Sequence, residues 1–301
     1  MRVLISGAGG LIGGAVSALL KERRHQVCAL VRDPRKARPG DLLWQPAHPL
    51  ETAQLAGFDA IVHLAGSPVA VRWTEAAKAE IRNSRVEGTA NLARVTARSW
   101  IDSGKPRVLI CGSAIGYYGS RGDEELVEES EAGLGFLAEV CRQWESAAQP
   151  AAMAGVRMAH MRTSLVLSTK GGALAKMLPA FRLGVAGRLG SGRQWWSWVS
   201  LEDAARAFAF AVENEPVHGA LNLAAPHPVT NAEFTRTLGR VLRRPAWLAV
   251  PAWALRLAAG EMAEEMLLAS QRVTPKRLLE AGFNFEDTEL EATLRKLLKR
   301  S

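Results

Sequence analysis

The sequence has few cysteines, with only Cys28, Cys111 and Cys141 in 301 residues. An odd, sparse set without paired spacing argues against a disulfide framework. The six histidines form no metal-ligand spacing with these cysteines or with one another. We therefore predict neither a disulfide scaffold nor a metal site, and we expect Cys28 and Cys111, which lie in apolar runs, to be small core residues.

Long hydrophobic runs are also missing. No stretch reaches the ~20 apolar residues that a membrane span needs. Glycines interrupt the apolar N-terminal segment, and the charged run Lys21-Glu22-Arg23-Arg24 follows it without a small-residue cleavage site. This pattern argues against a signal peptide. We expect a cytoplasmic protein with no membrane partner.

Continuous basic segments are absent as well, although the net charge is +8 and the isoelectric point about 9.8. The longest blocks are the pairs Arg23-Arg24 and Arg243-Arg244. Positive charge spread along a chain, without interleaved aromatic residues, does not predict a nucleic-acid partner. It favours an anionic cofactor and a small-molecule substrate.

What the chain does have is a regular alternation of short apolar runs with helical patterns. The runs span residues 2–6, 27–31, 59–64, 107–111 and 156–162. Strands that alternate with helices indicate βαβ units and a parallel sheet, and continuous apolar runs indicate strands that are buried on both faces. We therefore predict an α/β fold with a doubly wound parallel sheet of the Rossmann type.

The pattern changes after residue 167. A helix is predicted over 201–214 and a strand over 220–224, and from Asn231 onward the pattern is almost wholly helical. Asn231 suits a helix N-cap. The predicted division is a nucleotide-binding domain over 1–167, to which 196–225 returns, and a smaller, mainly helical lobe over 168–195 and 226–301.

The glycine-rich segment Gly7-Ala8-Gly9-Gly10-Leu11-Ile12-Gly13 follows the first strand and opens an amphipathic helix. A pyrophosphate needs bare backbone N–H groups at a helix N-terminus, and side chains would block its approach. Gly7 serves the turn, Gly10 the phosphate contact and Gly13 the packing of helix against strand. This context predicts a dinucleotide site.

Arg32 ends the second predicted strand, where an acidic residue would bind the ribose of NAD. A guanidinium at this position can pair with a 2′-phosphate, so we predict NADP(H) as the cofactor. Asp33 lies one residue later and is interpreted as a turn cap before Pro34.

Several motifs resemble the extended branch of the short-chain dehydrogenase/reductase superfamily. More narrowly, the chain resembles an atypical, nucleotide-sugar-epimerase-like family with a small C-terminal domain of unknown function. The segments that carry the resemblance include residues 7–13, 65–66, 72–74, 83–85, 112–119, 144–145, 190–194, 197–199 and 230–234.

This resemblance implies an NADP-binding oxidoreductase or epimerase acting on a small polar, nucleotide-sugar-like substrate. We expect a monomer or homodimer. It implies that the cofactor contacts Gly7, Gly10, Leu11, Ile12, Arg32, Ala65, Gly66 and Ser113. It also implies that residues 190–198, and among them Gly192, Gln194 and Trp198, lie near the substrate.

The usual catalytic tyrosine, with a lysine four residues later, is missing. Tyr117 and Tyr118 are the only tyrosines, and Leu137 and Cys141 occupy the expected positions. One interpretation has Ser113 polarise the substrate while Tyr117 or Tyr118 acts as acid/base, with Arg121 at the cation spacing. In a second, another group or water serves as the base. In a third, the protein is a non-catalytic NADPH-binding sensor.

Two of these assignments keep an alternative. Tyr117 and Tyr118 either take part in catalysis or pack over the cleft. Trp195, Trp196 and Trp198 form either a core between the lobes or a wall of the substrate site.

Overall fold

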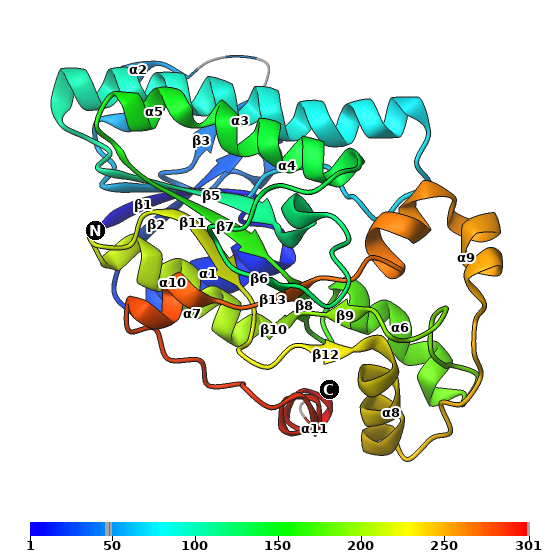
Figure 1. The fold of residues 1–301 in the computed structure, drawn as a ribbon. Helices are drawn as coiled ribbons and strands as arrows, with labels where there is room; N and C mark the ends of the chain where they lie inside the picture. The colour runs from blue at the N-terminus through cyan, green and yellow to red at the C-terminus, as the bar shows by residue number, and fades with distance from the viewer. Residues whose placement is uncertain (46–47, 49, 300–301) are drawn as a thin grey trace.

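The computed structural model describes residues 1–45, 48 and 50–299. Its centre is a parallel seven-stranded sheet with the order β11-β7-β5-β4-β1-β2-β3 (Figure 1). The strands are β1 (Arg2–Ser6), β2 (Gln26–Val31), β3 (Leu42–Leu43), β4 (Ala60–His63), β5 (Val108–Ala114), β7 (Arg157–Thr163) and β11 (Gly219–Leu223). This confirms the predicted doubly wound sheet. The order reverses between β1 and β4, and ligands bind at the carboxyl ends of the strands at such a switch point.

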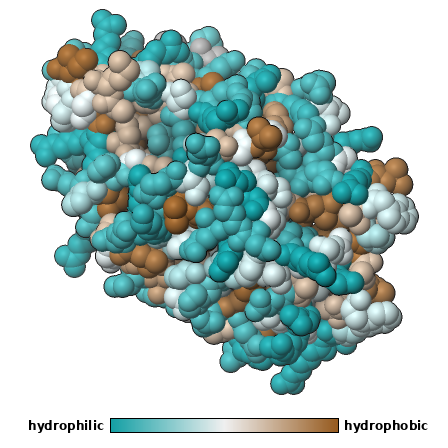
Figure 2. Space-filling model, in the orientation of Figure 1, coloured by the Kyte–Doolittle hydropathy of each residue, from teal (hydrophilic) through white to brown (hydrophobic). Residues whose placement is uncertain are grey.

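Helices cover both faces of the sheet because alternate strand residues point to opposite sides. Val3 and Ile5 of β1 belong to the core beneath α1 (Leu11–Glu22) and α7 (Leu201–Glu213). Leu4 belongs to the opposite core, under α3 (Glu75–Ser103) and α5 (Gln149–Met153). Figure 1 shows α2 (Thr52–Leu55), α3, α4 (Phe136–Ala147) and α5 on one side of the sheet. The face drawn in Figure 2 is mostly hydrophilic, with separate hydrophobic patches.

A smaller group of helices lies beside the sheet. It contains α6 (Gly172–Arg182), α8 (Asn231–Leu242), α9 (Ala252–Ala259) and α11 (Leu290–Lys299), whereas α10 (Lys276–Glu280) packs against β11 of the sheet. Three short strand pairs accompany them: β8 (Leu165–Leu167) with β10 (Trp198–Ser200), β9 (Trp195–Trp196) with β12 (Val229–Thr230), and β6 (Glu125–Leu126) with β13 (Arg272–Val273). We propose the division predicted from the sequence as the domain organisation. Among the described residues, no helix combines the length and apolarity needed to cross a membrane.

Three polar residues, Asp203, Thr230 and Asn231, cap a helix or hold segments of the C-terminal region in place. Thr230, rather than the predicted Asn231, is the N-cap of α8, because its hydroxyl accepts a hydrogen bond from the Glu233 amide. Asn231 is buried, and its side-chain oxygen accepts from the Leu189 amide. The buried Asp203 carboxylate near the start of α7 accepts from the amides of Glu286 and Asp287. The chain before α11 is thereby fixed to the main domain.

The ends of β1 and β4 are joined by Ser6. Its hydroxyl oxygen accepts from the amides of Leu64 and Ala65 at 3.1 and 3.2 Å and lies 2.6 Å from His63 Nδ1. Since the oxygen accepts from both amides, its single proton is donated to Nδ1, and the His63 ring is neutral. Burial lowers the pKa of His63 from 6.5 to about 4.

This burial predicts a pH-dependent stability. Above pH 6.5 the ring is neutral in the folded and the unfolded chain, whereas between pH 6.5 and 4 only the unfolded chain gains the proton. The free energy of unfolding therefore falls over that range, by up to about 3 kcal/mol from this residue. Urea unfolding at a series of pH values measures the slope. His63→Gln should flatten it and the exposed His218→Gln should not; equal slopes in both variants would contradict the assignment.

Candidate functional site

The glycine turn packs directly against the end of β4. Gly7 has φ of +73°, and a Cβ there would lie 2.8 Å from the Leu64 carbonyl. The Gly10 amide donates to the Gly7 carbonyl at 2.9 Å, which closes the turn. A Cβ on Gly13 would lie 2.2 Å from the same oxygen. Side chains at Gly7 and Gly13 are therefore excluded by backbone.

The N-terminus of α1 is open toward a pocket. Gly10 is its N-cap, no side chain caps the helix, and its first turn contains no acidic residue. The free N–H groups and the helix dipole therefore favour an anion. The pocket has a volume of about 330 Å³. Its lining includes five predicted cofactor residues, Gly7, Gly10, Leu11, Ile12 and Gly13.

The opposite wall of this pocket was not predicted. It consists of Ser164, Leu165 and Val166 around β8 and of Gly172 and Ala173 at the start of α6. The adjacent glycines at 171 and 172 were the sequence signal for this wall. A Cβ on Gly172 would lie 3.3 Å from Leu11 Cδ2, so glycine at this point lets the two walls of the pocket approach each other.

Arg32 is exposed directly after β2, and no hydrogen bond or ion pair occupies its side chain within the described chain. Asp33 is the cap of the following turn, as predicted, and accepts from the Arg35 amide. The Arg35 side chain pairs with the same carboxylate through two hydrogen bonds of 2.9 Å, which lower the pKa of Asp33. The negative charge of Asp33 is thus balanced by Arg35, and the Arg32 side chain remains available to bind an anion.

Ser113 lies within β5 and is buried, next to α4. Its hydroxyl donates to Glu145 Oε1 at 2.6 Å. Arg162 of β7 binds both oxygens of that carboxylate at 2.9 Å. Because its proton is used, Ser113 can offer a ligand only lone pairs. Sequence reasoning missed Glu145 and Arg162 as a pair, although Trp144-Glu145 belonged to the family motifs.

Tyr118, at the end of the 3₁₀ helix η2 (Ile115–Tyr118), does not fit the predicted acid–base role. The side chain is fully buried. Its hydroxyl donates to Asn222 Oδ1 at 2.7 Å and accepts from Arg162 at 2.9 Å. Burial raises its pKa to about 12. Tyr118 therefore holds η2 against β7 and β11 and has no proton free for a substrate.

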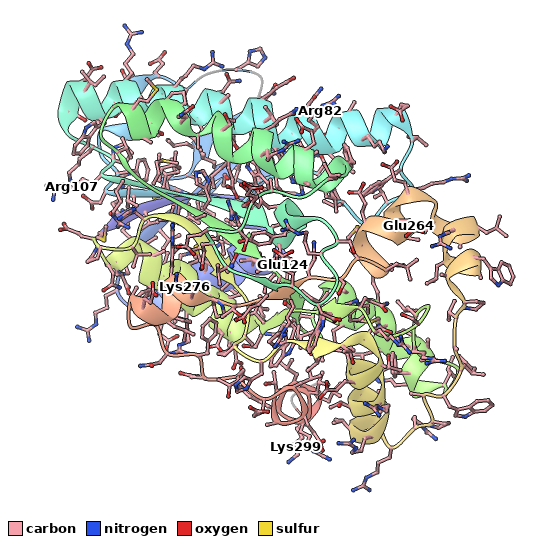
Figure 3. All side chains as sticks on the ribbon, viewed as in Figure 1. Arg82, Arg107, Glu124, Glu264, Lys276 and Lys299 are labelled. Carbon is pink, nitrogen blue, oxygen red and sulfur yellow. The ribbon has the colours of Figure 1, made fainter. Side chains whose placement is uncertain are left out.

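Tyr117 differs from its neighbour, since it is only partly buried and its hydroxyl has no hydrogen-bond partner among the described residues. The Arg162 guanidinium lies 3.5 Å from the centre of its ring. Arg121, which the sequence spacing suggested as the cation, pairs instead with Glu124, which is labelled in Figure 3. The cation beside Tyr117 thus comes from β7 rather than from the same loop.

Two of the three predicted substrate residues have their polar groups committed to the protein. Trp198 is fully buried in the C-terminal core, and its indole N–H donates to the His227 carbonyl. Gln194 is buried, and its amide donates to the carbonyls of Leu189 and Leu267. These two side chains hold segments together, contrary to the predicted substrate contact. Gly192 has φ of +73° and packs beside Ala232 and Arg188.

Ala65 and Gly66 follow β4 at the same edge of the sheet as Ser113, and they do not line the pocket at the glycine turn. On α4, Leu137 and Cys141 stand where the usual acid–base pair would be, and burial raises the pKa of the Cys141 thiol to about 12. Within the described chain, no group of three or more His, Cys, Asp or Glu side chains forms a potential metal site.

Comparison with known proteins gives matches over the whole chain. Residues 3–224 match the NAD dependent epimerase/dehydratase family, and residues 250–297 match a domain of unknown function, DUF1731. The chain is 42% identical over 294 residues to the epimerase family protein Mb2239 of Mycobacterium bovis, which covers 97% of this chain and 96% of that protein. It is 35% identical over 302 residues to human epimerase family protein SDR39U1, which covers 99% and 100%.

Solved structures agree with these matches. The crystal structure of human SDR39U1 (isoform2) with NADPH superposes with a TM-score of 0.91 at 34% identity and covers 100% of both chains. MoeE5 in complex with UDP-glucuronic acid and NAD is 19% identical, with a TM-score of 0.77, and shares the fold.

The two tyrosines should differ in their effect on stability. Tyr118→Phe leaves a buried Asn222 carbonyl oxygen and an Arg162 N–H without their partner, so we expect a loss of ~1–3 kcal/mol in the free energy of unfolding. Tyr117→Phe removes a hydroxyl that bonds to no described residue and should change stability by less than about 0.5 kcal/mol. Denaturant unfolding of both variants checks this, and equal losses would contradict the assignment.

Proposed function

The chain belongs to the NAD-dependent epimerase/dehydratase family, and on this basis we propose that it is an NADP(H)-dependent oxidoreductase or epimerase acting on a small polar substrate. The observation that supports this activity is a free phenol, Tyr117, stacked on the buried Arg162 at the carboxyl edge of the sheet. A substrate of nucleotide-sugar type is consistent with the family and with the MoeE5 complex.

The described residues fit NADP(H). A diphosphate would rest on the bare backbone from Gly7 to Gly13 at the start of α1, where any Cβ on Gly7 or Gly13 meets backbone. The unpaired Arg32 guanidinium would hold the 2′-phosphate. Ala65, Gly66 and Ser113 would face the nicotinamide half. The crystal structure of human SDR39U1 with NADPH supports the choice of this cofactor.

Tyr117 is the proposed acid–base group. NADP(H) held at this site would supply hydride chemistry at nicotinamide C4, and a protein group would then have to exchange a proton with the substrate oxygen. Arg162, whose guanidinium carbon lies 3.5 Å from the centre of the Tyr117 ring, takes the place of the lysine of the usual pair in this proposal.

Ser113 is proposed as an acceptor that positions the ligand. With its own proton donated to Glu145, its oxygen accepts from a hydroxyl or an amide N–H. This differs from the predicted polarisation of a carbonyl, which would require Ser113 to donate. A second, non-reacting hydroxyl of the substrate would therefore be oriented by Ser113, while Tyr117 would exchange a proton with the reacting oxygen.

The alternative function is an NADPH-binding sensor without turnover. The Ser113 hydroxyl already donates to Glu145 and the Tyr118 hydroxyl to Asn222. Two of the three predicted catalytic hydroxyls are therefore not free to donate to a substrate, which favours the sensor. This alternative requires the cofactor site to be intact and Tyr117 to be dispensable.

Arg32 should control cofactor choice. Arg32→Ala removes the charge available to a 2′-phosphate, and we expect the NADPH dissociation constant to rise ~10- to 100-fold while NADH binding changes little. Isothermal titration calorimetry measures both. The matched control is Arg35→Ala, whose side chain is already paired with Asp33 and should leave NADPH affinity within about threefold. Equal losses in both variants would contradict the assignment of Arg32.

Tyr117 should be needed for hydride transfer. C4-deuterated NADPH incubated with a panel of carbonyl metabolites should deliver label to at least one product, detected by mass spectrometry. Tyr117→Phe should lower that rate by ~10²- to 10⁴-fold with unchanged NADPH affinity. Arg121→Gln serves as the control, because this side chain pairs with Glu124 away from the phenol. Wild-type protein that binds NADPH but labels no product would favour the sensor.

A further inference from the structure

The segment that leads into α9, and α9 itself, carry exposed apolar side chains. Trp247 precedes the helix and Trp253 lies in its first turn, and these residues are 77% and 66% exposed. Leu257 is 83% exposed and lies four residues after Trp253, on the same face of the helix. No residue of α9 is buried. The helix therefore presents to solvent an apolar face that the described chain does not cover.

A second exposed segment lies beside the first. The Val250 amide donates to the Arg188 carbonyl at 2.9 Å. A Cβ on Gly184 would lie 3.2 Å from Pro245 Cγ. The chain after α6 thus runs along the chain before α9, at the side of the molecule in Figure 1. Together the two segments form an exposed surface, called here the apolar patch, that consists of Leu183, Val185, Trp247, Trp253 and Leu257.

The two segments are also strongly basic. Residues 176–194 and 241–260 contain seven Lys or Arg and no Asp or Glu. Arg256 pairs with Glu264, which follows α9. Three other cations have exposed side chains that make no hydrogen bond or ion pair with the described chain: Arg182, Arg243 and Arg244. The apolar patch is therefore accompanied by positive charge that the described residues do not balance.

This combination matches the surface of an anionic membrane. Tryptophan is enriched where an apolar interior meets polar headgroups, because its ring is apolar and its N–H is polar. Lys and Arg beside an apolar helix face add affinity for anionic headgroups. Binding at the surface requires no segment that crosses the bilayer. The sequence-based expectation of no membrane partner rested on the lack of long apolar runs and did not address this mode of binding.

Two other occupants of the patch fit less well. A second copy of the chain would place arginines opposite arginines, and like charges that face each other oppose association. Nucleic acid would match the charge, but its interfaces are polar. The aliphatic side chains of Leu183, Val185 and Leu257 would gain little there, whereas a bilayer removes them from water.

We propose that the apolar patch and its arginines dock this protein on an anionic membrane surface. In this arrangement α9 lies at the headgroup level with Trp253 and Leu257 toward the acyl chains, and Arg243 and Arg244 contact lipid phosphates. The inference goes beyond the proposed function and depends neither on turnover nor on the cofactor.

Co-sedimentation of the full chain with lipid vesicles tests this proposal. We expect binding to vesicles made of equal parts of phosphatidylglycerol and phosphatidylcholine, and none to phosphatidylcholine alone. Trp247→Ser combined with Trp253→Ser should lower the partition coefficient ~10-fold or more, because two apolar contacts are lost. Arg243→Gln combined with Arg244→Gln should lower it by about 10- to 30-fold, and added salt should weaken binding of the wild type.

Matched controls remove the same kinds of side chain elsewhere. Ile101→Ser combined with Met153→Ser removes two exposed apolar side chains of α3 and α5. Arg82→Gln combined with Arg107→Gln removes two exposed arginines, both labelled in Figure 3. Both controls should bind vesicles as the wild type does. Because every substituted side chain is exposed, all four variants should keep the melting temperature of the wild type within about 2 °C.

The proposal is wrong if the protein stays in the supernatant with anionic vesicles, if neutral vesicles bind it equally well, or if either patch variant binds like the wild type. An equal loss of binding in a control variant would also overturn it. Two further results would assign the patch to another occupant: a dimer in sedimentation velocity that the tryptophan variant converts to monomer, or binding of single-stranded DNA that the arginine variant abolishes.

Discussion

The buried ion pair between Arg162 and Glu145 holds the candidate site together. From the end of β7, Arg162 reaches α4 through the carboxylate, η2 through the Tyr118 hydroxyl, and the following loop through the Glu128 carbonyl. Breaking a buried pair by removing one partner costs about 3–5 kcal/mol, because the other charge is left without compensation. The orientation of Ser113 and the charge over Tyr117 both depend on this one contact. A structural pair thereby determines which protons are available for chemistry.

The parts of the fold that the sequence predicted are those with local signals. Continuous apolar runs identify buried parallel strands, and the glycines at Gly7, Gly10 and Gly13 mark a turn in which side chains have no room. Asp33 before Pro34 was recognisable as a cap for the same reason, since its partner is the amide two residues later. For such features, residues close in sequence decide the geometry.

The remaining features depend on contacts between distant segments. No feature of the neighbouring sequence distinguishes Tyr117 from Tyr118. The Tyr118 hydroxyl nevertheless donates to Asn222 of the edge strand β11, whereas the Tyr117 hydroxyl bonds to no described residue. Gln194 and Trp198 carry polar groups typical of a binding site, but their partners, the carbonyls of Leu267 and His227, come from segments distant in the sequence.

The position of β11 has a consequence for synthesis of the chain. This strand closes the sheet against β7, yet more than fifty residues separate the two along the chain. At ~5–20 residues per second, the open edge of β7 would wait roughly 3–11 s on the ribosome for its partner. An unpaired, hydrophobic strand edge is a template for misplaced pairing during that interval. Pairing of the β7 edge is therefore complete only after Leu223 has emerged from the ribosome.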